Sequence, residues 1–382
     1  MLPLFYVISH YSNLPFRAWE QRKFIEIINR LSKTSNSSIL PKVEYEDIIA
    51  EEGRLNKDIS NKFDSRKGIL FQPKNILYGK LRPYLKNWLY PDFKGVAVGD
   101  FWVFEAIEAT PRFIYNLIQS DSYQKVANDT AGTKMPRSDW TKVSNSSFFI
   151  PKESSEQKRI GTFFKQLDDT IALHQRKLDT LKQMKKGLLQ QMFPKSEEDV
   201  PKIRFADFDE EWYQRKLGEE FEKINERNDG SFGKTHWISV AKMYFVEPNK
   251  VLSNNIDTRT YVMRKGDIAF EGHSNTDFKF GRFVANDIGP GIVSELFPVY
   301  RHKTNYDNNY WKNAIQLEHI MAPIYSKSIT SSGNSSNKLD SKHFLNQKIY
   351  IADFEEQEKI GSIFKQLDNT IILYQNKLNK FD

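Results

Sequence analysis

The stretch EQKRIGTFFKQLDDTI at residues 156–171 returns two hundred residues later as EQEKIGSIFKQLDNTI at residues 356–371. From Glu156 to Leu178, about two positions in three match the residue two hundred further on, which is too many for chance in a segment of mixed composition. A segment that recurs at this distance indicates a chain built from two related halves. The fold is therefore expected to contain one structural plan twice.

Apolar residues recur in both copies at alternating steps of four and three, which is the pattern of a coiled-coil seam. Lys, Gln, Asp and Arg fill the positions between them, as is typical of solvated flanks. A narrow seam on a long helix cannot bury itself, so we expect the two copies to pack against each other; the alternatives are packing of each helix onto its own domain or onto a separate chain. The seam of the first copy is Ile160, Phe164, Leu167, Ile171, His174, Leu178, Leu181, Lys185 and Leu188, and that of the second is Ile360, Phe364, Leu367, Ile371, Tyr374, Leu378 and Phe381.

The first helix is predicted to run from about residue 154 to residue 193, or roughly 60 Å at 1.5 Å per residue. Ser154 and Ser155 are its candidate N-caps, because Gln157 follows Ser154 in capping-box spacing. The second helix is predicted from about residue 354 to the end of the sequence, so it is shorter.

The two seams carry polar residues at one equivalent position, His174 in the first copy and Tyr374 in the second. Polar seam residues fix the register of coiled coils, and we expect that role here. A metal-binding or pH-sensing role for His174 is not favoured.

The parts that precede the two helices repeat more weakly. Each opens on a similar motif, AWEQRK in the first half and EWYQRK in the second, and each ends in an apolar strand followed by the EQ of the helix. The charged stretch between the halves is typical of a linker. The predicted organisation is a globular domain at 1–152, a long helix at 153–194, a linker at 195–210, a second globular domain at 211–352 and a second long helix at 353–382.

Each globular part is predicted to be an α+β domain with a small irregular sheet. GVAVGDFWVFEA at 95–106 and YVMRKGDIAF at 261–270 are short runs broken by Gly and Asp, which is typical of strands and turns. Residues 111–128 and 308–329 carry helical spacing. Two further apolar strands are predicted at 148–151 and 349–352.

The composition favours a polyanionic partner. The chain has 56 Lys and Arg against 49 Asp and Glu, a formal net charge of +7 and a sequence pI of about 9.1. This balance suits nucleic acid, with an ordinary moderately basic protein as the alternative. The absence of cysteine excludes disulfides, thiolate metal sites and cysteine nucleophiles.

The sequence predicts no membrane segment. It contains no apolar run of 18 residues, and its mean hydropathy is −0.61. The apolar opening MLPLFYVISHY has neither a basic n-region nor a small-residue cleavage site, so it does not read as a signal peptide. We therefore expect a cytoplasmic protein without a membrane partner.

Further motifs surround the repeated helix in a set order. They are AWEQRK at 18–23, ILYGKLRPYL at 76–85, NDTAGTKMPRSDW at 128–140 and KKGLLQQMFP at 185–194. Together with the duplicated EQ-x-x-IG-x-[FI]-F-x-QLD helix, this order resembles the specificity subunits of type I restriction–modification systems, which act in bacterial defence. The resemblance extends from about Trp19 to the end of the sequence.

The resemblance implies two target-recognition domains, each reading one half of a bipartite, asymmetric site in double-stranded DNA. The two long helices would form an antiparallel coiled coil that sets the unread spacer between the halves. The implied partners are two modification subunits, which bind S-adenosylmethionine and methylate adenine, and two restriction subunits, which use ATP and Mg. The chain itself would bind no cofactor and contribute no catalytic residue.

The residues agree with a non-catalytic chain. The sequence contains no G-x-x-x-x-G-K-[ST] phosphate loop and no Asn/Asp-Pro-Pro-aromatic motif of adenine methylation. Asp92 and Glu105 match a nuclease carboxylate pair only loosely, because the following lysine is missing. The seven histidines show no metal-ligand spacing, so no metal site is expected.

Two departures from the family pattern keep other functions open. The first fifteen residues do not match the usual start, and the second helix stops at Asp382 where the first copy continues through KKGLLQQMFP. A shortened coil would change the helix overlap, and therefore the spacer or the grip on partner subunits. The alternatives are a stand-alone or decoy DNA-binding protein with a shortened coil, and a coiled-coil interaction protein unrelated to DNA.

Two loops in each half carry the residue types that contact DNA, namely Lys, Arg and small polar donors. Gly132 in one of them permits a close backbone approach. Tyr84 and Trp88 are expected in the core, and Lys134 and Lys338 line up across the duplication. The expected DNA-binding residues are Lys80, Arg82, Lys86, Thr133, Lys134 and Arg137 in the first half and Lys279, Arg282, Ser332, Asn334, Asn337 and Lys338 in the second.

Overall fold

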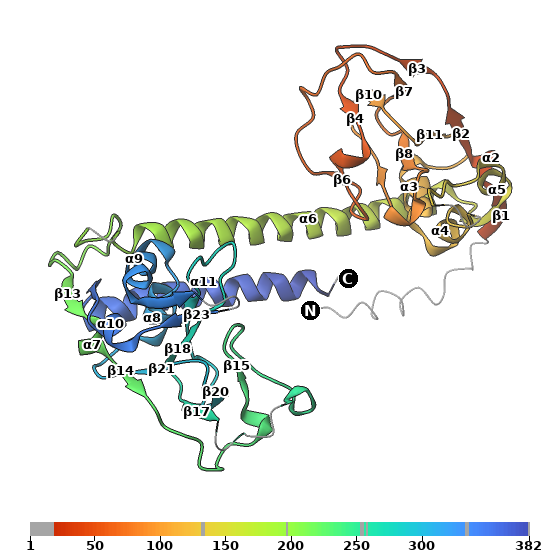
Figure 1. The fold of residues 1–382 in the computed structure, drawn as a ribbon. Helices are drawn as coiled ribbons and strands as arrows, with labels where there is room; N and C mark the ends of the chain where they lie inside the picture. The colour runs from red at the N-terminus through yellow and green to blue at the C-terminus, as the bar shows by residue number, and fades with distance from the viewer. Residues whose placement is uncertain are drawn as a thin grey trace. The chain divides into compact units, whose positions relative to one another are not determined.

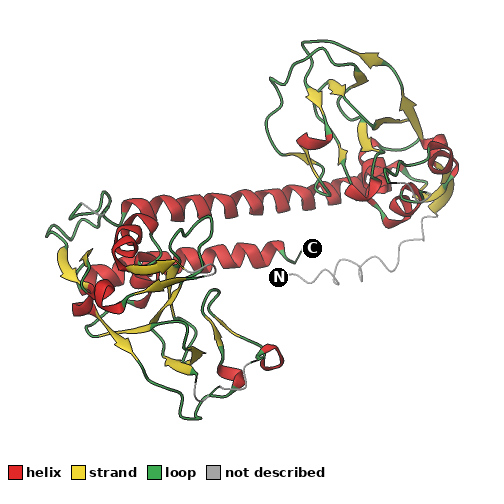
Figure 2. Cartoon of the chain, viewed as in Figure 1, coloured by secondary structure: helices red, strands yellow, loops and turns green. Residues whose placement is uncertain are grey.

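The computed structural model describes residues 19–130, 134–195, 198–252, 256, 259–332 and 336–380. Its internal contacts divide the chain into two compact units, unit 1 (Met1–Thr170) and unit 2 (Ile171–Asp382), which we describe one at a time. One helix, α6 (Ser154–Gln191), begins in unit 1 and ends in unit 2 (Figure 1). Both units mix helices and strands, which confirms the expected mixture of α and β structure (Figure 2).

Unit 1 contains two four-stranded sheets and a layer of short helices. One sheet has the strand order β2-β11-β8-β9 and is antiparallel throughout; the other has the order β3-β7-β10-β4, in which β10 and β4 run parallel. β1 pairs with β12, which brings the start of the unit to the start of α6. The elements are β1 (Trp19–Lys23), α2 (Phe24–Ile27), β2 (Ile28–Leu31), β3 (Thr34–Ser35), β4 (Lys42–Val43), η1 (Tyr45–Asp47), β5 (Ile48–Ile49), β6 (Arg54–Leu55), β7 (Gly68–Phe71), β8 (Ile76–Gly79), η2 (Pro83–Leu85), β9 (Trp88–Leu89), β10 (Gly95–Ala97), β11 (Phe101–Ala106), α3 (Pro111–Gln119), α4 (Asp121–Ala127), α5 (Trp140–Asn145) and β12 (Ser147–Pro151).

The central strand β8 of unit 1 is buried on both faces. Successive residues of a strand point to opposite faces of the sheet. Ile76 and Tyr78 belong to the cluster that holds Ile114 of α3, while Leu77 between them belongs to the cluster that holds Phe71 of the second sheet. Helices therefore cover one face of the first sheet, and the second sheet covers the other.

Unit 2 repeats the plan of unit 1. Its four-stranded antiparallel sheet has the order β14-β21-β18-β19, which matches β2-β11-β8-β9 strand for strand, and β13 pairs with β24 as β1 pairs with β12. The elements are β13 (Tyr213–Lys216), α7 (Leu217–Glu220), β14 (Phe221–Ile224), η3 (Lys234–His236), β15 (Ile238–Ser239), β16 (Tyr244–Phe245), η4 (Pro248–Lys250), β17 (Thr260–Met263), β18 (Ile268–Glu271), β19 (Arg282–Ala285), β20 (Gly291–Ser294), β21 (Val299–His302), α8 (Asn308–Ala314), α9 (Glu318–Ser328), β22 (Ile329–Ser332), β23 (Asn337–Leu339), α10 (Ser341–Leu345), β24 (Lys348–Ile351) and α11 (Phe354–Leu378).

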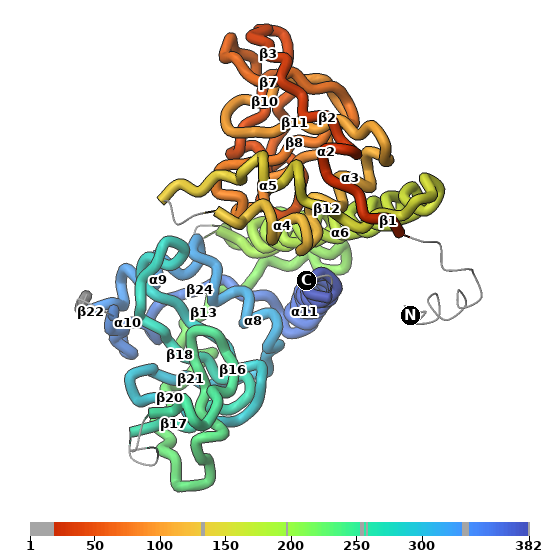
Figure 3. The backbone as a smooth tube through the Cα atoms, turned by 90° about the vertical axis from the view of Figure 1, so that its right-hand side faces the viewer, coloured from red at the N-terminus to blue at the C-terminus, as the bar shows by residue number. Residues whose placement is uncertain are grey.

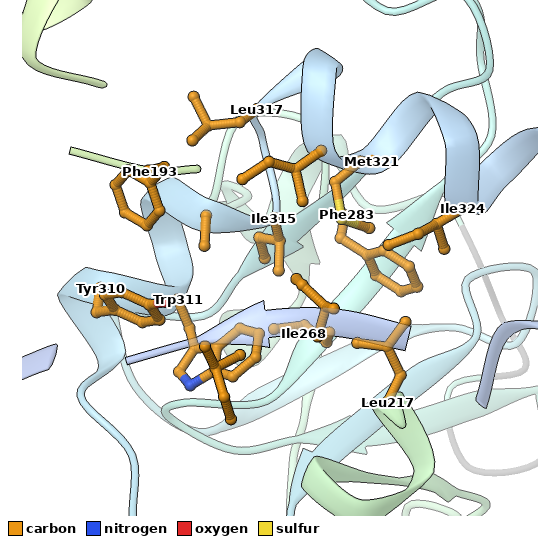
Figure 4. Close-up of a cluster of buried hydrophobic side chains, with 14 of the residues drawn as sticks. Phe193, Leu217, Ile268, Phe283, Tyr310, Trp311, Ile315, Leu317, Met321 and Ile324 are labelled. Carbon is orange, nitrogen blue, oxygen red and sulfur yellow. The ribbon is translucent and has the colours of Figure 1, made fainter. Parts of the chain in front are cut away.

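The main core of unit 2 lies between this sheet and helices α8 and α9. Ile268 and Phe283 from the sheet and Trp311 from α8 are completely buried in it (Figure 4). Phe193, two residues after the end of α6, joins the same core and lies beside Tyr310 with 5.2 Å between ring centroids. The end of α6 is therefore held by the core of unit 2.

Within unit 2, the last part of α6 also lies against α11. The rings of His174 and Tyr374 have centroids 5.5 Å apart, and Lys185 Nζ donates a hydrogen bond to Asp368 Oδ1 at 2.6 Å. The residue number falls along α11 as it rises along α6, so the two segments run in opposite directions. Figure 3 views α11 nearly end-on.

The start of α6 agrees with the predicted position, but its cap does not. The backbone N–H of Gln157 bonds to the carbonyl of Glu153, so Glu153 is the cap residue and Ser154 and Ser155 lie in the first turn. The capping-box prediction is wrong because the Gln157 side chain is used elsewhere. Its Oε1 accepts a hydrogen bond from the backbone N–H of Thr110 at 2.8 Å.

Most other predicted elements are confirmed, with different ends. The strands predicted at 148–151 and 349–352 are β12 and β24. Each predicted helical segment is broken in two, 111–128 into α3 and α4 and 308–329 into α8 and α9. The seam position Phe381 lies outside the described residues.

A buried histidine should make unit 2 sensitive to acid. Burial lowers the pKa of His302 from 6.5 to about 3, and its ring stacks on Tyr306 with centroids 3.8 Å apart. The unfolded chain binds a proton more readily, so this contribution to stability is complete above pH 6.5 and is lost as the pH falls toward 3. Between pH 7.5 and pH 5, we expect the free energy of unfolding in urea to fall by about 2 kcal/mol from this group. The variant His302→Phe should flatten the pH profile, whereas His343→Phe, at an exposed position, should not.

Candidate nucleic-acid interface

The first loop of the candidate interface links β8 to β9 in unit 1. Pro83–Leu85 form one turn of 3-10 helix, and Arg82 and Lys86 on either side have left-handed backbones with φ of 49° and 54°. Such a conformation costs a residue other than glycine about 1–3 kcal/mol, persists only where the surrounding structure holds it, and is found most often at functional sites. The two strained cations mark this loop as a functional candidate.

A second segment lies beside this loop. Leu81 and Arg137 form a β-bridge, the backbone N–H of Arg82 donates to the carbonyl of Pro136 at 2.7 Å, and that of Ser138 donates to the carbonyl of Lys80 at 2.8 Å. The structure thus brings together predicted residues that lie some fifty positions apart in the sequence. We call this set the unit 1 basic cluster; it consists of Lys80, Arg82, Lys86, Lys134 and Arg137.

Tyr45 and Asp100 hold the loop of the cluster in place through hydrogen bonds and ion pairs. The Tyr45 hydroxyl donates to the carbonyl of Asp100 at 2.6 Å and accepts from the backbone N–H of Leu81 at 3.1 Å. Partial burial acts to raise the pKa of the Asp100 carboxyl, but the hydrogen bond from Arg137 and the nearby Lys80 outweigh it and hold this pKa below its usual value. Asp100 is therefore ionised at neutral pH and orients two of the cations.

The cations of the cluster differ in whether they form ion pairs with carboxylates among the described residues. Arg137 lies 3.0 Å and Lys80 lies 3.5 Å from Asp100, and Lys86 lies 3.1 Å from Glu51. Arg82 and Lys134 are exposed, and neither has an ion pair with any residue that the structure describes. These two side chains are therefore the most accessible for contact with a DNA phosphate.

Unit 2 repeats the arrangement with fewer charges. The loop after β18 lies beside β23, because the backbone N–H of Asn337 donates to the carbonyl of Gly272 at 2.9 Å. Lys279 and Lys338 are exposed near this contact. Arg282, however, is engaged by the protein. Its Nη2 donates to the carbonyl of Ala241 at 2.5 Å, and its guanidinium lies 4.8 Å from the centre of the Phe278 ring.

Three predicted residues are not placed by side chain. Thr133 and Asn334 lie outside the described residues. Ser332 is described only by its backbone, which pairs with Asn337 in the β22–β23 hairpin.

Two sequence-based expectations about the interface need correction. Tyr84 is 56% exposed at the tip of the first loop, whereas Trp88 is buried as expected. Lys338 stands two residues before Asp340, which caps α10, so its counterpart two residues before the α5 cap Asp139 is Arg137 and not Lys134. The flanking Pro83 and the left-handed residues turn Tyr84 outward, and no periodic pattern in a short loop signals this.

Sequence reasoning also missed a polar pair in unit 2. His273 lies next to Gly272 in the loop, and its Nδ1 and backbone N–H both contact the buried carboxylate of Glu271. The pair fixes the start of the loop. In the sequence, the only sign of this pair is that it stands at the end of strand β18.

The described residues contain neither a cluster of metal-ligating side chains nor a helix that could span a membrane. Among them, no three His, Asp or Glu side chains gather as a metal site would require. No helix in the described ranges is both long and apolar enough to cross a membrane.

Comparison with known proteins relates part of the chain to a DNA-specificity domain. Residues 18–183 match the family model described as the type I restriction modification DNA specificity domain. This part of the chain, which includes all the described residues of unit 1, is similar to that domain. The resemblance drawn from the motif order is confirmed.

Two solved structures share the fold over nearly the whole chain. The type I restriction–modification S subunit from M. genitalium is 14% identical, and the match covers 97% of this chain and 94% of that one with a TM-score of 0.57. A chain from a structure concerned with complex assembly and conformational transition of the type I R-M system is 15% identical, with coverage of 97% and 95% and a TM-score of 0.53. At these identities the likeness is one of fold. A comparison with proteins of curated function returned no match.

Proposed function

We propose that this chain is the DNA-specificity subunit of a type I restriction–modification complex. Residues 1–152 and 211–352 act as two target-recognition domains, each reading one half of a bipartite, asymmetric DNA site. The observation that carries the proposal is the duplication: both units have the same strand order, and both hold a loop after the third strand of the sheet against a second segment rich in polar residues. Two readers that are related but differ in sequence suit a site with two unlike halves.

The long helices at 153–194 and 353–382 form an antiparallel coiled coil that sets the unread spacer. The opposite directions of α6 and α11 where they touch in unit 2 support this role. So does the ion pair from the seam residue Lys185 to Asp368, because a charged pair across a seam favours one register.

The chain acts with partners and has no catalytic residue of its own. We propose two modification subunits that carry S-adenosylmethionine and two restriction subunits that use ATP and Mg. The fold shared with a chain of a type I R-M system supports this assembly. The residues in the two loop regions are cations, amides and hydroxyls, which suit binding rather than chemistry.

Exchange of one recognition domain tests the proposal. Replacing residues 24–150 with the equivalent part of a related subunit should change one half of the methylated DNA sequence and leave the other half intact. Methylome sequencing of cells that carry the exchanged gene, the original gene or neither gives the readout. A simultaneous change in both halves would contradict the modular reading. DNA binding without any adenine methylation, and without capture of a modification subunit, would favour the stand-alone or decoy alternative.

A further inference from the structure

The residues that follow α6 fill a hydrophobic socket in unit 2. Met192 and Phe193 are buried there, and the Phe193 ring lies among three aromatic rings (Figure 4 shows it beside Tyr310). The centroid distances are 6.2 Å to Trp212, 5.2 Å to Tyr310 and 6.1 Å to Phe364. We call Met192 and Phe193 the plug.

Unit 1 contains the same socket. Trp19 and Trp212 hold equivalent places, because each donates its indole N–H to the glutamate that precedes the Gln of the repeated segment, Glu156 or Glu356. Trp19 packs edge-on against the next aromatic ring of the socket, Phe113, at 6.5 Å, as Trp212 packs near Tyr310 at 6.0 Å.

Two further rings of the unit 2 socket, Tyr310 and Phe364, also have equivalents in unit 1. Phe113 and Tyr310 each lie three residues after the helix N-cap whose N–H bonds to Gln157 or Gln357, and Phe164 corresponds to Phe364 in the repeated segment. The three rings that surround the plug in unit 2 therefore all have aromatic counterparts in unit 1.

The described residues leave the unit 1 socket open. Trp19, Phe113 and Phe164 line a groove of about 490 Å³. Trp19 is 47% exposed where Trp212 is 3% exposed, and Phe164 is 45% exposed where Phe364 is fully buried. Apolar surface of this kind is stabilised by being covered.

Glu156, which bonds to Trp19 beside the groove, has no cationic partner among the described residues, whereas Glu356 in unit 2 has one. In unit 2, Glu356 accepts two hydrogen bonds from the guanidinium of Arg204, at 2.8 and 2.9 Å, and a third from Trp212. In unit 1, Glu156 Oε1 accepts only the indole N–H of Trp19 at 3.1 Å, and the buried Oε2 has no partner among the described residues. A buried carboxylate oxygen without a donor is costly, so this site favours a cationic donor.

We infer that this groove is a docking site for a segment of another polypeptide, a helix end that carries a Met-Phe pair and, about eleven residues later, an arginine. The Met-Phe pair occupies the groove and the guanidinium completes the bonding of Glu156. We assign the segment to another polypeptide because Met192, Phe193 and Arg204 of this chain are already engaged in unit 2.

A labelled synthetic peptide with the sequence of residues 185–205 tests this inference on the full-length protein. We expect saturable binding by fluorescence anisotropy, and loss of about tenfold or more when both plug residues of the peptide are alanine, because two buried side chains are removed. The protein variant Phe164→Asp should weaken binding to the same degree. Phe163→Asp, at a neighbouring position of similar exposure outside the groove, should not.

A double-mutant cycle tests the charge. Glu156→Gln in the protein and Arg204→Gln in the peptide should each lower the affinity about tenfold, and the two together should cost little more than either alone. Independent losses would show that the two groups do not meet. The loss seen with the Arg204→Gln peptide on the unchanged protein cannot come from a folding defect.

Three outcomes would overturn the inference. The first is no binding of the peptide. The second is binding only after residues 2–17 are deleted, which would assign the groove to the chain's own N-terminal segment. The third is a concentration-dependent dimer that Phe164→Asp breaks, which would assign it to a second copy of the chain.

Discussion

Reversing the charge of Arg82 and Lys134 together should weaken binding to the specific DNA duplex roughly a hundredfold, since each reversal removes a phosphate contact and adds a repulsion. Both side chains are exposed and unpaired among the described residues, so their loss should leave the fold intact. The measurement is fluorescence anisotropy with a duplex that carries the methylated site. The slope of log affinity against log salt should also become shallower by about two, because two fewer counterions are released.

The matched control is Lys94→Glu. Lys94 is an exposed lysine of unit 1 that stands directly before β10, outside the basic cluster. It should leave the affinity and the salt slope close to those of the original protein. If the control and the double reversal had equal effects, the binding would depend on overall charge, and the cluster would have no special role.

The second large effect concerns stability. Glu356→Ala should lower the free energy of unfolding by about 3–5 kcal/mol, because it leaves the largely buried guanidinium of Arg204 without its partner. It also removes the acceptor of the Trp212 indole N–H. Urea denaturation, followed by the fluorescence of the tryptophans, measures the change.

Two comparisons make this prediction specific. Glu358→Ala, at an exposed position two residues further along α11, should change the stability by less than about 0.5 kcal/mol. Glu156→Ala in unit 1 should cost about 1 kcal/mol, because that carboxylate accepts a single hydrogen bond and pairs with no arginine among the described residues. Equal losses for Glu156→Ala and Glu356→Ala would mean that unit 1 has a partner for its carboxylate.

Local patterns were enough to predict the main elements of the fold. The four-three spacing predicted the long helix to within two residues at its end, and apolar runs predicted strands β12 and β24. The predicted cap was wrong because the choice of Glu153 depends on a contact with Thr110, more than forty residues away. The spacing of residues along the helix does not reveal a contact with such a distant residue.

For the unit 1 basic cluster, too, the sequence predicted the residue types but not their pairing. The residue types of the two loops marked them as DNA-binding candidates, but sequence could not tell which cations are free. Asp100 engages Lys80 and Arg137, and Glu51 engages Lys86, through contacts between distant parts of the chain. In unit 2 the predicted contact Arg282 is occupied by a backbone carbonyl.

The duplication, the positions of the long helices and the family resemblance follow from the order of residues along the chain, in which repeats and periodicity are directly visible. The exposure of Phe164 and the burial of its counterpart Phe364 follow only from how the chain packs. The difference arises from Met192 and Phe193, which cover one copy of the socket and not the other. Burial and pairing depend on which distant segments meet in space, and two segments of similar sequence can differ in what they meet.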